Sequence, residues 1–373
     1  MLPTVPSSRA SGSHWLRVGI FVNAKAALRS LNTQWRMARP STVLASMLFM
    51  APALAQVGMT QSLVDDLPFT IVYPTDETSK QHPFGPFDLD VALDAAPSRG
   101  NGRLILFSHG SGGDAYTLNT LARTLALAGF VVAQPEHQGD NRRDQSDSGI
   151  VSWMRRPTEI SHAIDTVAAN PRFSGALHLD RVGVYGVSAG GGTGLALAGA
   201  DWSLATLRQH CTAHIQDDKG FCLYGVQNAK VSAARAQSYL DPLPAHGDDP
   251  LAGPRIKDPR VSAVAVSVPV GAIFAQKSLA AIRMPVGVIE AQADLVLNPK
   301  YHSGYVLANC KACIRLDSVR GGGHFDTLSP WPDVIAKAAA MAPGAQRNPA
   351  IDDARRQKSY DKIASFFRDQ LLR

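Results

Sequence analysis

The sequence predicts an α/β protein with a mostly parallel sheet that helices cover on both faces. Two observations support this prediction. Short continuous apolar runs, such as residues 104–107 and 182–187, are typical of strands that are buried on both faces. Stretches with helical periodicity alternate with these runs along most of the chain, which is the order expected for parallel strands joined by crossover helices.

The first half of the chain opens with two strand-like runs before the alternation begins. Residues 69–73 and 87–93 have β-like patterns, and a loop rich in Pro, His and Gly separates them, which indicates an antiparallel edge. After these runs we expect buried strands at 104–107, 130–133 and 182–187, with helices at 116–128, 159–170 and 189–200.

Strand and helix alternate again in the second half of the chain. We expect strands at 261–268, 286–289 and 313–316 and helices at 301–308 and 352–371. Residues 201–258 interrupt this order, because they are polar and rich in Asp, Gln and Pro. We interpret them as an insertion, which is either a lid-like segment over the sheet or an excursion on the surface.

Residues 1–55 have the composition of a targeting segment. They contain six basic residues and no Asp or Glu, and an apolar run ends in Ala53-Leu54-Ala55. This pattern is typical of a secretory signal peptide, so we predict cleavage between Ala55 and Gln56. The mature part, 56–373, is then a single exported domain, periplasmic or secreted, without a stable membrane span. Met37 is an alternative start, and an uncleaved membrane anchor is the alternative interpretation of the segment.

The net charge of +6 comes from this targeting segment. The chain has 37 Lys and Arg residues and 31 Asp and Glu residues, and six of the basic residues lie in 1–55. The mature chain therefore carries 31 residues of each sign. Because it is close to neutral, its charge does not favour nucleic acid as a partner.

The four cysteines form two close pairs in the sequence, Cys211 with Cys222 and Cys310 with Cys313. In an oxidising compartment local pairing is the simplest arrangement, although four cysteines allow three connectivities. The C-x-x-C of the second pair also suits a thioredoxin-like site. Such a motif opens a helix, however, whereas this one runs into a strand-like stretch, so we expect structural disulfides.

Ser188 lies between the 182–187 strand and a helix of small residues, within Gly186-Val187-Ser188-Ala189-Gly190. This G-x-S-x-G pattern needs small residues two positions before and after the serine, because strand and helix approach closely at a sharp turn. The start of the helix also places backbone N–H groups beside the serine oxygen. We therefore predict that Ser188 is a nucleophile.

A second glycine-rich turn, residues 108–113, follows the 104–107 strand. Reactive groups collect at the carboxyl ends of strands in an open parallel sheet, so this turn is expected near Ser188. An ester hydrolase needs N–H donors aimed at the oxyanion that forms during reaction. We expect the backbone N–H groups of Ser111 and Ala189 to provide them.

Two further strand ends supply an acid and a base. Asp294 follows the 286–289 strand and suits the carboxylate that orients a histidine, with Glu290, Asp317 and Asp326 as rival acids. His324 follows three glycines after the last strand and suits the general base. The chain order Ser, Asp, His is that of α/β-hydrolases.

Other histidines have different expected roles. His109 belongs to the glycine-rich turn, and His137 follows a buried strand and is expected to brace the site. His210 and His214 are four residues apart, a spacing that can hold zinc on one helix face. Because no third ligand is evident in the sequence and no glutamate follows His210, we expect neither a metal nor an organic cofactor.

Together these motifs resemble the α/β-hydrolase superfamily, and more narrowly its dienelactone hydrolase-like and platelet-activating-factor acetylhydrolase-like branch of exported bacterial proteins. The resemblance covers roughly residues 66–330. The segments that carry it are SHGSGG (108–113), GFVVAQPEHQGD (129–140), GVSAGG (186–191), PVGVIEAQAD (285–294) and GGGHF (321–325).

The resemblance implies an α/β-hydrolase fold and a serine hydrolase that cleaves carboxylic esters, with a small-molecule or lipid ester as substrate. It implies Ser188, Asp294 and His324 as the triad. Dienelactone hydrolases proper have a cysteine nucleophile where this chain has a serine, so their lactone substrate does not carry over. Rival functions are a phospholipase A2-like acetylhydrolase, an amide or peptide hydrolase, and a catalytically inactive binding module on the same fold.

Overall fold

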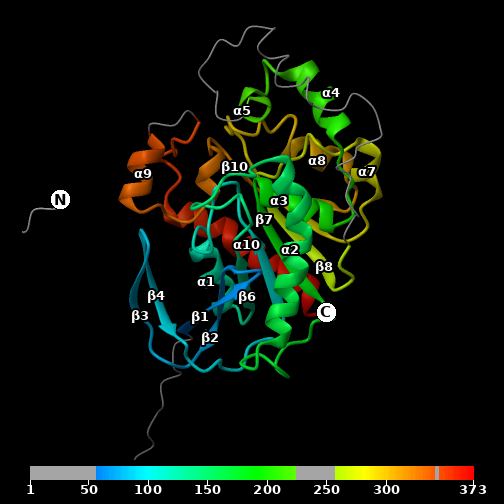
Figure 1. Cartoon of the computed structure of the whole chain (residues 1–373). Helices are drawn as coiled ribbons and strands as arrows, with labels where there is room; N and C mark the ends of the chain where they lie inside the picture. Colours follow the sequence, from blue (N-terminus) through cyan, green and yellow to red (C-terminus); the bar gives the residue numbers. More distant parts are fainter. Residues whose placement is uncertain (1–55, 224–256, 341–343) are drawn as a thin grey trace, which may run out of the picture. The chain divides into compact units, whose positions relative to one another are not determined.

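The computed structural model describes residues 56–223, 257–340 and 344–373, all within one compact unit (Figure 1). The predicted signal peptide, 1–55, lies outside the described residues, and so does most of the predicted insertion, 224–256. Among the residues that the structure describes, no helix is both long and apolar enough to cross a bilayer.

One mixed sheet runs through the described part of the chain, with strand order β10-β9-β8-β7-β5-β6-β2-β1-β4-β3. The strands from β10 to β6 are parallel to their neighbours, whereas β2 is antiparallel to both β6 and β1. At the far edge β1 and β4 are parallel, and β3 and β4 form an antiparallel hairpin. The strands are β1 (Gln56–Val64), β2 (Leu67–Thr75), β3 (Lys80–Phe84), β4 (Phe87–Leu93), β5 (Leu104–Ser108), β6 (Val131–Pro135), β7 (Val182–Val187), β8 (Val261–Ser267), β9 (Val286–Ala291) and β10 (Cys313–Val319).

Helices cover both faces of this sheet, with α2 and α3 in front of it in the view of Figure 1. Strand β7 illustrates the reason: its side chains alternate between two apolar cores, one on each face of the sheet, and each core needs helices to cover it. Val182 and Val184 join the core beneath α2 and α3, and Tyr185 and Val187 join the core beneath α1 and α10. The helices are α1 (Asn119–Leu127), α2 (Ile150–Ala169), α3 (Ala189–Leu197), α4 (Leu204–His214), α5 (Lys219–Cys222), α7 (Gln276–Ala281), α8 (Ser303–Asn309), α9 (Asp333–Ala340) and α10 (Asp353–Leu371), with a 3-10 turn η1 (His324–Thr327).

The predicted α/β class and mostly parallel sheet are confirmed, and several element boundaries need correction. The sequence does not predict strand β1, and β3 lies in the stretch between residues 73 and 87 whose Pro, His and Gly residues indicate a loop. Proline is tolerated in β3 because this strand lies at the edge of the sheet. Helix α2 begins at Ile150 rather than at 159, and the predicted insertion contributes the two helices α4 and α5.

Candidate active site

The turn between β7 and α3 holds Ser188 in a conformation that side chains rarely adopt. Its φ of 56° lies in the left-handed region, where a non-glycine residue is strained. A Cβ atom on Gly186 would lie 2.0 Å from the carbonyl oxygen of Gly190, and one on Gly190 would lie 1.9 Å from that of Ser108. Both positions of the G-x-S-x-G pattern therefore require glycine for steric reasons.

The structure brings Ser188, His324 and Asp294 into one hydrogen-bonded chain, named here the cavity triad. The His324 Nε2 atom lies 3.0 Å from the Ser188 Oγ atom, and the His324 Nδ1 atom lies 2.7 Å from Asp294 Oδ2. The other oxygen of Asp294 accepts N–H bonds from Val296 and Leu297, both at 2.8 Å. These two bonds leave Oδ2 facing the imidazole, so Nδ1 carries the proton and Nε2 is free to accept one from Ser188.

The three rival acids have other partners. Glu290 accepts a hydrogen bond from the Ser318 hydroxyl. Asp326 accepts the N–H of Gly323, which directly precedes the 3-10 turn η1. Asp317 binds Lys362 and other donors of α10, and although burial alone would raise the pKa of Asp317, these donors lower it. The structure therefore places only Asp294, of the four acids considered, on His324.

The predicted oxyanion donors lie beside Ser188. A Cβ atom on Gly110 would be 3.3 Å from the Ser188 Cβ atom, so the glycine-rich turn after β5 packs directly against the serine. Ser111 and Ala189 both line the cavity that opens at Ser188. No hydrogen bond from the backbone N–H of either residue is seen within the described part of the chain. Both N–H groups are thus available to an oxygen of a bound molecule.

A buried ion pair holds the glycine-rich turn after β5 in place. The Arg156 guanidinium lies 2.7 Å from Asp140, and both side chains are fully buried. Asp140 in turn accepts the Gly112 N–H and the hydroxyl of Ser111. Burial alone would raise the pKa of Asp140, but the charge of Arg156 and the hydroxyl of Ser148 outweigh it and lower the pKa. The carboxylate therefore stays ionised and holds the turn in place.

A second Ser–His–acid chain lies behind the turn and is named here the buried triad. The Ser108 Oγ atom is 2.8 Å from His137 Nε2, and His137 Nδ1 is 2.5 Å from Glu159 Oε2. Ser108 and His137 are 0% exposed, and none of the three residues lines the cavity at Ser188. This arrangement ties the ends of β5 and β6 to α2, which agrees with the bracing role expected for His137.

The cavity beside Ser188 has a volume of about 520 Å³. This size lies within the range of small-molecule binding sites. Its lining is mostly apolar, with side chains from α2, α4, α5 and the segments that follow β8, β9 and η1. The charged side chains Asp114 and Arg142 also line the cavity, and they form an ion pair of 2.8 Å with each other.

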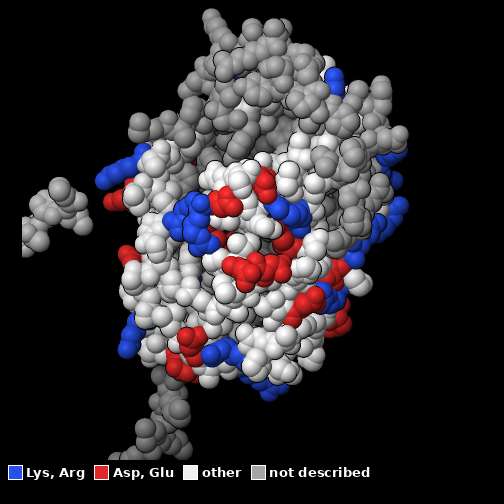
Figure 2. Space-filling model, viewed as in Figure 1, with Lys and Arg blue, Asp and Glu red and all other residues white. Residues whose placement is uncertain are grey.

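Basic and acidic side chains are interspersed on the molecular face shown in Figure 2. Ion pairs such as Arg143–Glu136 and Arg155–Asp147 occur in the described part of the chain. On that face the described residues form no wide area of one sign. This distribution agrees with the balanced charge of residues 56–373.

Both predicted disulfides are present. Cys211 joins Cys222, which links α4 to α5, and Cys310 joins Cys313, which spans the end of α8 and the start of β10. The C-x-x-C motif therefore does not open a helix, which agrees with a structural bond rather than a redox site. Disulfides are typical of exported proteins.

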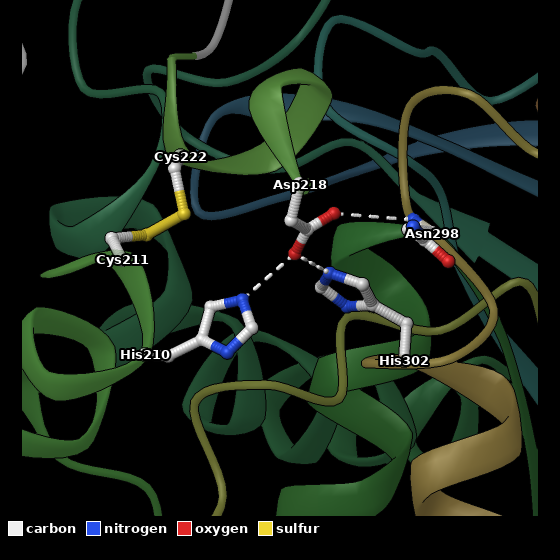
Figure 3. The surroundings of a disulfide bond; sticks show 6 residues. All are labelled: His210, Cys211, Asp218, Cys222, Asn298 and His302. Carbon is white, nitrogen blue, oxygen red and sulfur yellow. Dashed lines mark hydrogen bonds and ion pairs between the residues drawn. A yellow bond between two sulfur atoms is a disulfide. The ribbon is translucent and has the colours of Figure 1, made fainter. Parts of the chain in front are cut away.

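His210 has partners that its sequence spacing does not indicate. Asp218 Oδ2 lies 2.8 Å from His210 Nε2 and 2.9 Å from His302 Nε2 (Figure 3). The ring of His214 instead stacks on Tyr301. The three donor atoms are close enough to share a metal ion. Their distances, however, are those of hydrogen bonds.

The hydrogen bond at His302 Nδ1 determines which ring nitrogen of His302 carries the proton. The Nδ1 atom of His302 accepts the backbone N–H of Gly271 at 3.0 Å, so the ring proton is on Nε2 and points to Asp218. A metal ion would have to displace that proton, and Nδ1 would then face an N–H donor while carrying a proton itself. We therefore interpret the cluster as a hydrogen-bonded clamp.

Comparison with models of protein families finds no match for the chain, and no match is found among curated proteins. The functional assignment therefore depends on the geometry of the site. The roles of Asp140, Arg156, Glu159 and the Asp218 clamp in this site are not evident from the sequence. Only the buried position of Arg156 could have been suspected, since it lies on the apolar side of α2.

Proposed function

We propose that the protein is a serine hydrolase of α/β-hydrolase fold that cleaves carboxylic esters through an acyl-enzyme. One observation supports this proposal most strongly. The Asp294–His324–Ser188 hydrogen-bond chain ends at a strained serine that opens on an apolar cavity. Nucleophile, base and orienting acid are the three roles that acyl transfer by a serine requires.

The proposed reaction proceeds in two steps. His324 Nε2 takes the proton of Ser188 while Oγ attacks the ester carbonyl carbon, and the N–H groups of Ser111 and Ala189 stabilise the oxyanion. The tetrahedral intermediate collapses, and His324 gives its proton to the departing alcohol. Water then attacks the acyl-enzyme by the same route, with His324 as the base, and releases the acid and Ser188. Asp294 holds the imidazole in the required tautomer and stabilises the imidazolium that forms in each step.

We further propose that the protein is exported and that residues 1–55 are its signal peptide. The disulfides Cys211–Cys222 and Cys310–Cys313 support export, because such bonds persist mainly in oxidising compartments. N-terminal sequencing of the protein from the exported fraction is expected to begin at Gln56.

The esterase proposal is tested with a fluorophosphonate probe and p-nitrophenyl butyrate. We expect the probe to bond covalently to Ser188, as located by peptide mass mapping, and the ester to be hydrolysed without added metal. A folded protein that neither reacts with the probe nor hydrolyses the ester would instead be a binding module on this fold.

A further inference from the structure

We propose that the substrate is an ester with an extended apolar chain, and that the wall formed by α4, α5 and their disulfide is the surface that binds this chain. The inference rests on the proposed ester hydrolysis and adds the substrate class and its subsite. The wall, named here the α4–α5 wall, consists of Leu207, Cys211, Phe221, Cys222 and Leu223.

The α4–α5 wall offers apolar contact. All five of its side chains line the cavity at Ser188, and none of them carries a charge. Trp153 of α2 continues the wall, since its ring stacks on Phe221 at a centroid distance of 6.2 Å and an interplanar angle of 10°. The charged cavity residues Asp114 and Arg142 neutralise each other and come from other segments. A chain of methylene groups on this wall would therefore lose water without covering a charged side chain.

The wall is held in place at several points. The Cys211–Cys222 bond fixes α5 to α4, and Asp218, which precedes α5, binds both His210 and His302 (Figure 3). Burial alone would raise the pKa of Asp218, but the hydrogen bonds from the two histidines outweigh it and lower the pKa to about 2. The clamp is therefore an ionised carboxylate at any pH at which an ester hydrolase would work.

The clamp also joins the wall to the segment that carries the catalytic acid. Asp218 Oδ1 accepts the backbone N–H of Asn298, which follows Asp294 in the same loop. A Cβ atom on Gly220 would lie 2.3 Å from the carbonyl oxygen of Leu295, so α5 presses directly against that loop. The position of the wall relative to Ser188 is thus set by contacts with the loop that positions His324.

The test is a chain-length series with p-nitrophenyl acetate, butyrate and octanoate. Each methylene group that leaves water contributes roughly fourfold in kcat/KM, so the six methylene groups that distinguish the octanoate from the acetate set an upper bound of about 4000-fold. We expect the octanoate to exceed the acetate by at least about 100-fold, which corresponds to three or four methylene groups on the wall. A parallel series of ethyl, butyl and octyl acetate varies the alcohol chain instead of the acyl chain, so the two series together show which chain the wall binds. A preference in the first series places the acyl chain on the wall, and one in the second series places the alcohol chain there.

Wall variants test whether α4 and α5 cause the preference. We expect Phe221→Ala, Asp218→Asn and the double variant Cys211→Ser with Cys222→Ser each to lower the octanoate-to-acetate ratio by about tenfold. Both histidines bond to Oδ2 of Asp218 and the Asn298 N–H bonds to Oδ1, so in Asp218→Asn the amide NH2 would face either both histidine nitrogens or the Asn298 N–H. The ratio is measured on one preparation, so a partly unfolded sample does not change it.

Matched controls make the same chemical changes at residues that belong neither to the wall nor to the clamp. Asp217→Asn removes a neighbouring, exposed charge outside the clamp, and Cys310→Ser with Cys313→Ser removes the other disulfide. We expect both controls to keep the ratio within about twofold of the original protein. A control that lowers the ratio as much as the wall variants would overturn the proposal.

Two further results would overturn the inference, and a third result concerns the reaction itself. One is a protein that reacts with the fluorophosphonate and hydrolyses the acetate but has no chain preference in either series. The other is a rise in melting temperature with Zn²⁺ that Asp218→Asn abolishes, because the cluster would then be a metal site. If the protein neither hydrolyses the acetate nor reacts with the probe, the proposed ester hydrolysis itself is wrong.

Discussion

The cavity triad and the buried triad have the same types of residues and nearly the same geometry. The serine–histidine and histidine–acid distances are 3.0 and 2.7 Å in the cavity triad and 2.8 and 2.5 Å in the buried triad. Both also start at the carboxyl end of a parallel strand, β7 or β5. Hydrogen-bond distances alone therefore do not distinguish a reactive serine from an inert one.

The surroundings of the two serines make the difference. Ser188 follows β7 in a left-handed conformation, opens on the cavity and has the free N–H groups of Ser111 and Ala189 beside it. Ser108 is the last residue of β5, is 0% exposed and does not line that cavity. Access and oxyanion donors, more than the triad itself, make a site for acyl transfer.

The largest effect expected from this comparison is on the two serines. Ser188→Ala removes the proposed nucleophile, so we expect kcat for p-nitrophenyl acetate to fall by about 10⁴- to 10⁶-fold at unchanged melting temperature. Ser108→Ala is expected to change kcat by less than about tenfold. It leaves His137 Nε2 without its partner, and this costs about 1–3 kcal/mol of unfolding free energy.

Steady-state kinetics and urea denaturation of both variants measure these two effects separately. The fluorophosphonate serves as a control, because it should still react with the Ser108→Ala variant and not with the Ser188→Ala variant. The comparison fails if the probe is found on Ser108, or if both variants lose activity equally.

Substitutions of the two triad acids, Asp294 and Glu159, are expected to differ in the same way, with a somewhat smaller loss of kcat than for the two serines. Asp294→Asn puts His324 in the wrong tautomer, and we expect kcat to fall by about 10⁴-fold with little change in stability. Glu159→Gln is expected to lower the unfolding free energy by about 1–3 kcal/mol and kcat by less than about tenfold. Equal losses of kcat in both variants would mean that the buried triad takes part in the reaction.

The cavity triad could be predicted from the sequence because each member lies in a local pattern. Ser188 follows an apolar strand within G-x-S-x-G, and His324 follows three glycines after the last strand. Asp294 was chosen over three other acids, and the structure supplies the reason, since the rivals are held by other donors. The parallel strands were equally predictable, because strands buried on both faces are apolar throughout.

The buried triad and the Asp218 clamp could not be predicted, because contacts across the fold create them. Glu159 reaches His137 only through the packing of α2, and His302 reaches Asp218 across 84 positions of the chain. The sequence spacing of His210 and His214 suggested a pair, yet the fold gives His210 a different partner. The strand β3 was missed for a related reason, since its place at the sheet edge makes its proline acceptable.

The smallest expected effect is the pH dependence of the unfolding free energy that arises from the buried histidines His109 and His137. Burial is the largest cause that lowers the pKa of His109 from its ordinary value of 6.5 to about 3, and the neighbouring His137 and Arg156 act in the same direction. Its Nδ1 lies 2.7 Å from the Gly110 carbonyl oxygen, and its Nε2 accepts the His137 N–H, so neither nitrogen has room for a further proton. Burial also lowers the pKa of His137.

Stability should therefore fall in mild acid. Between the unfolded pKa of 6.5 and the folded pKa of about 3, the unfolded chain binds a proton that folded His109 does not, so the unfolding free energy decreases as the pH falls. This histidine contributes a loss of about 1.4 kcal/mol for each pH unit below about 6, and His137 adds to the loss. Carboxylates with lowered pKa, such as Asp218, contribute losses only below about pH 4.

Urea denaturation at pH 7, 6 and 5 measures this dependence, and His109→Gln tests its origin. The variant is expected to have a slope of unfolding free energy against pH that is smaller by about 1.4 kcal/mol per unit, whatever its stability at pH 7. His162→Gln is the matched control, because His162 is an exposed histidine that pairs with Asp65 at the surface. An original protein equally stable at pH 7 and pH 5 would show that the histidines behind the glycine-rich turn accept protons in the folded state, and the two triads would then not differ in this respect.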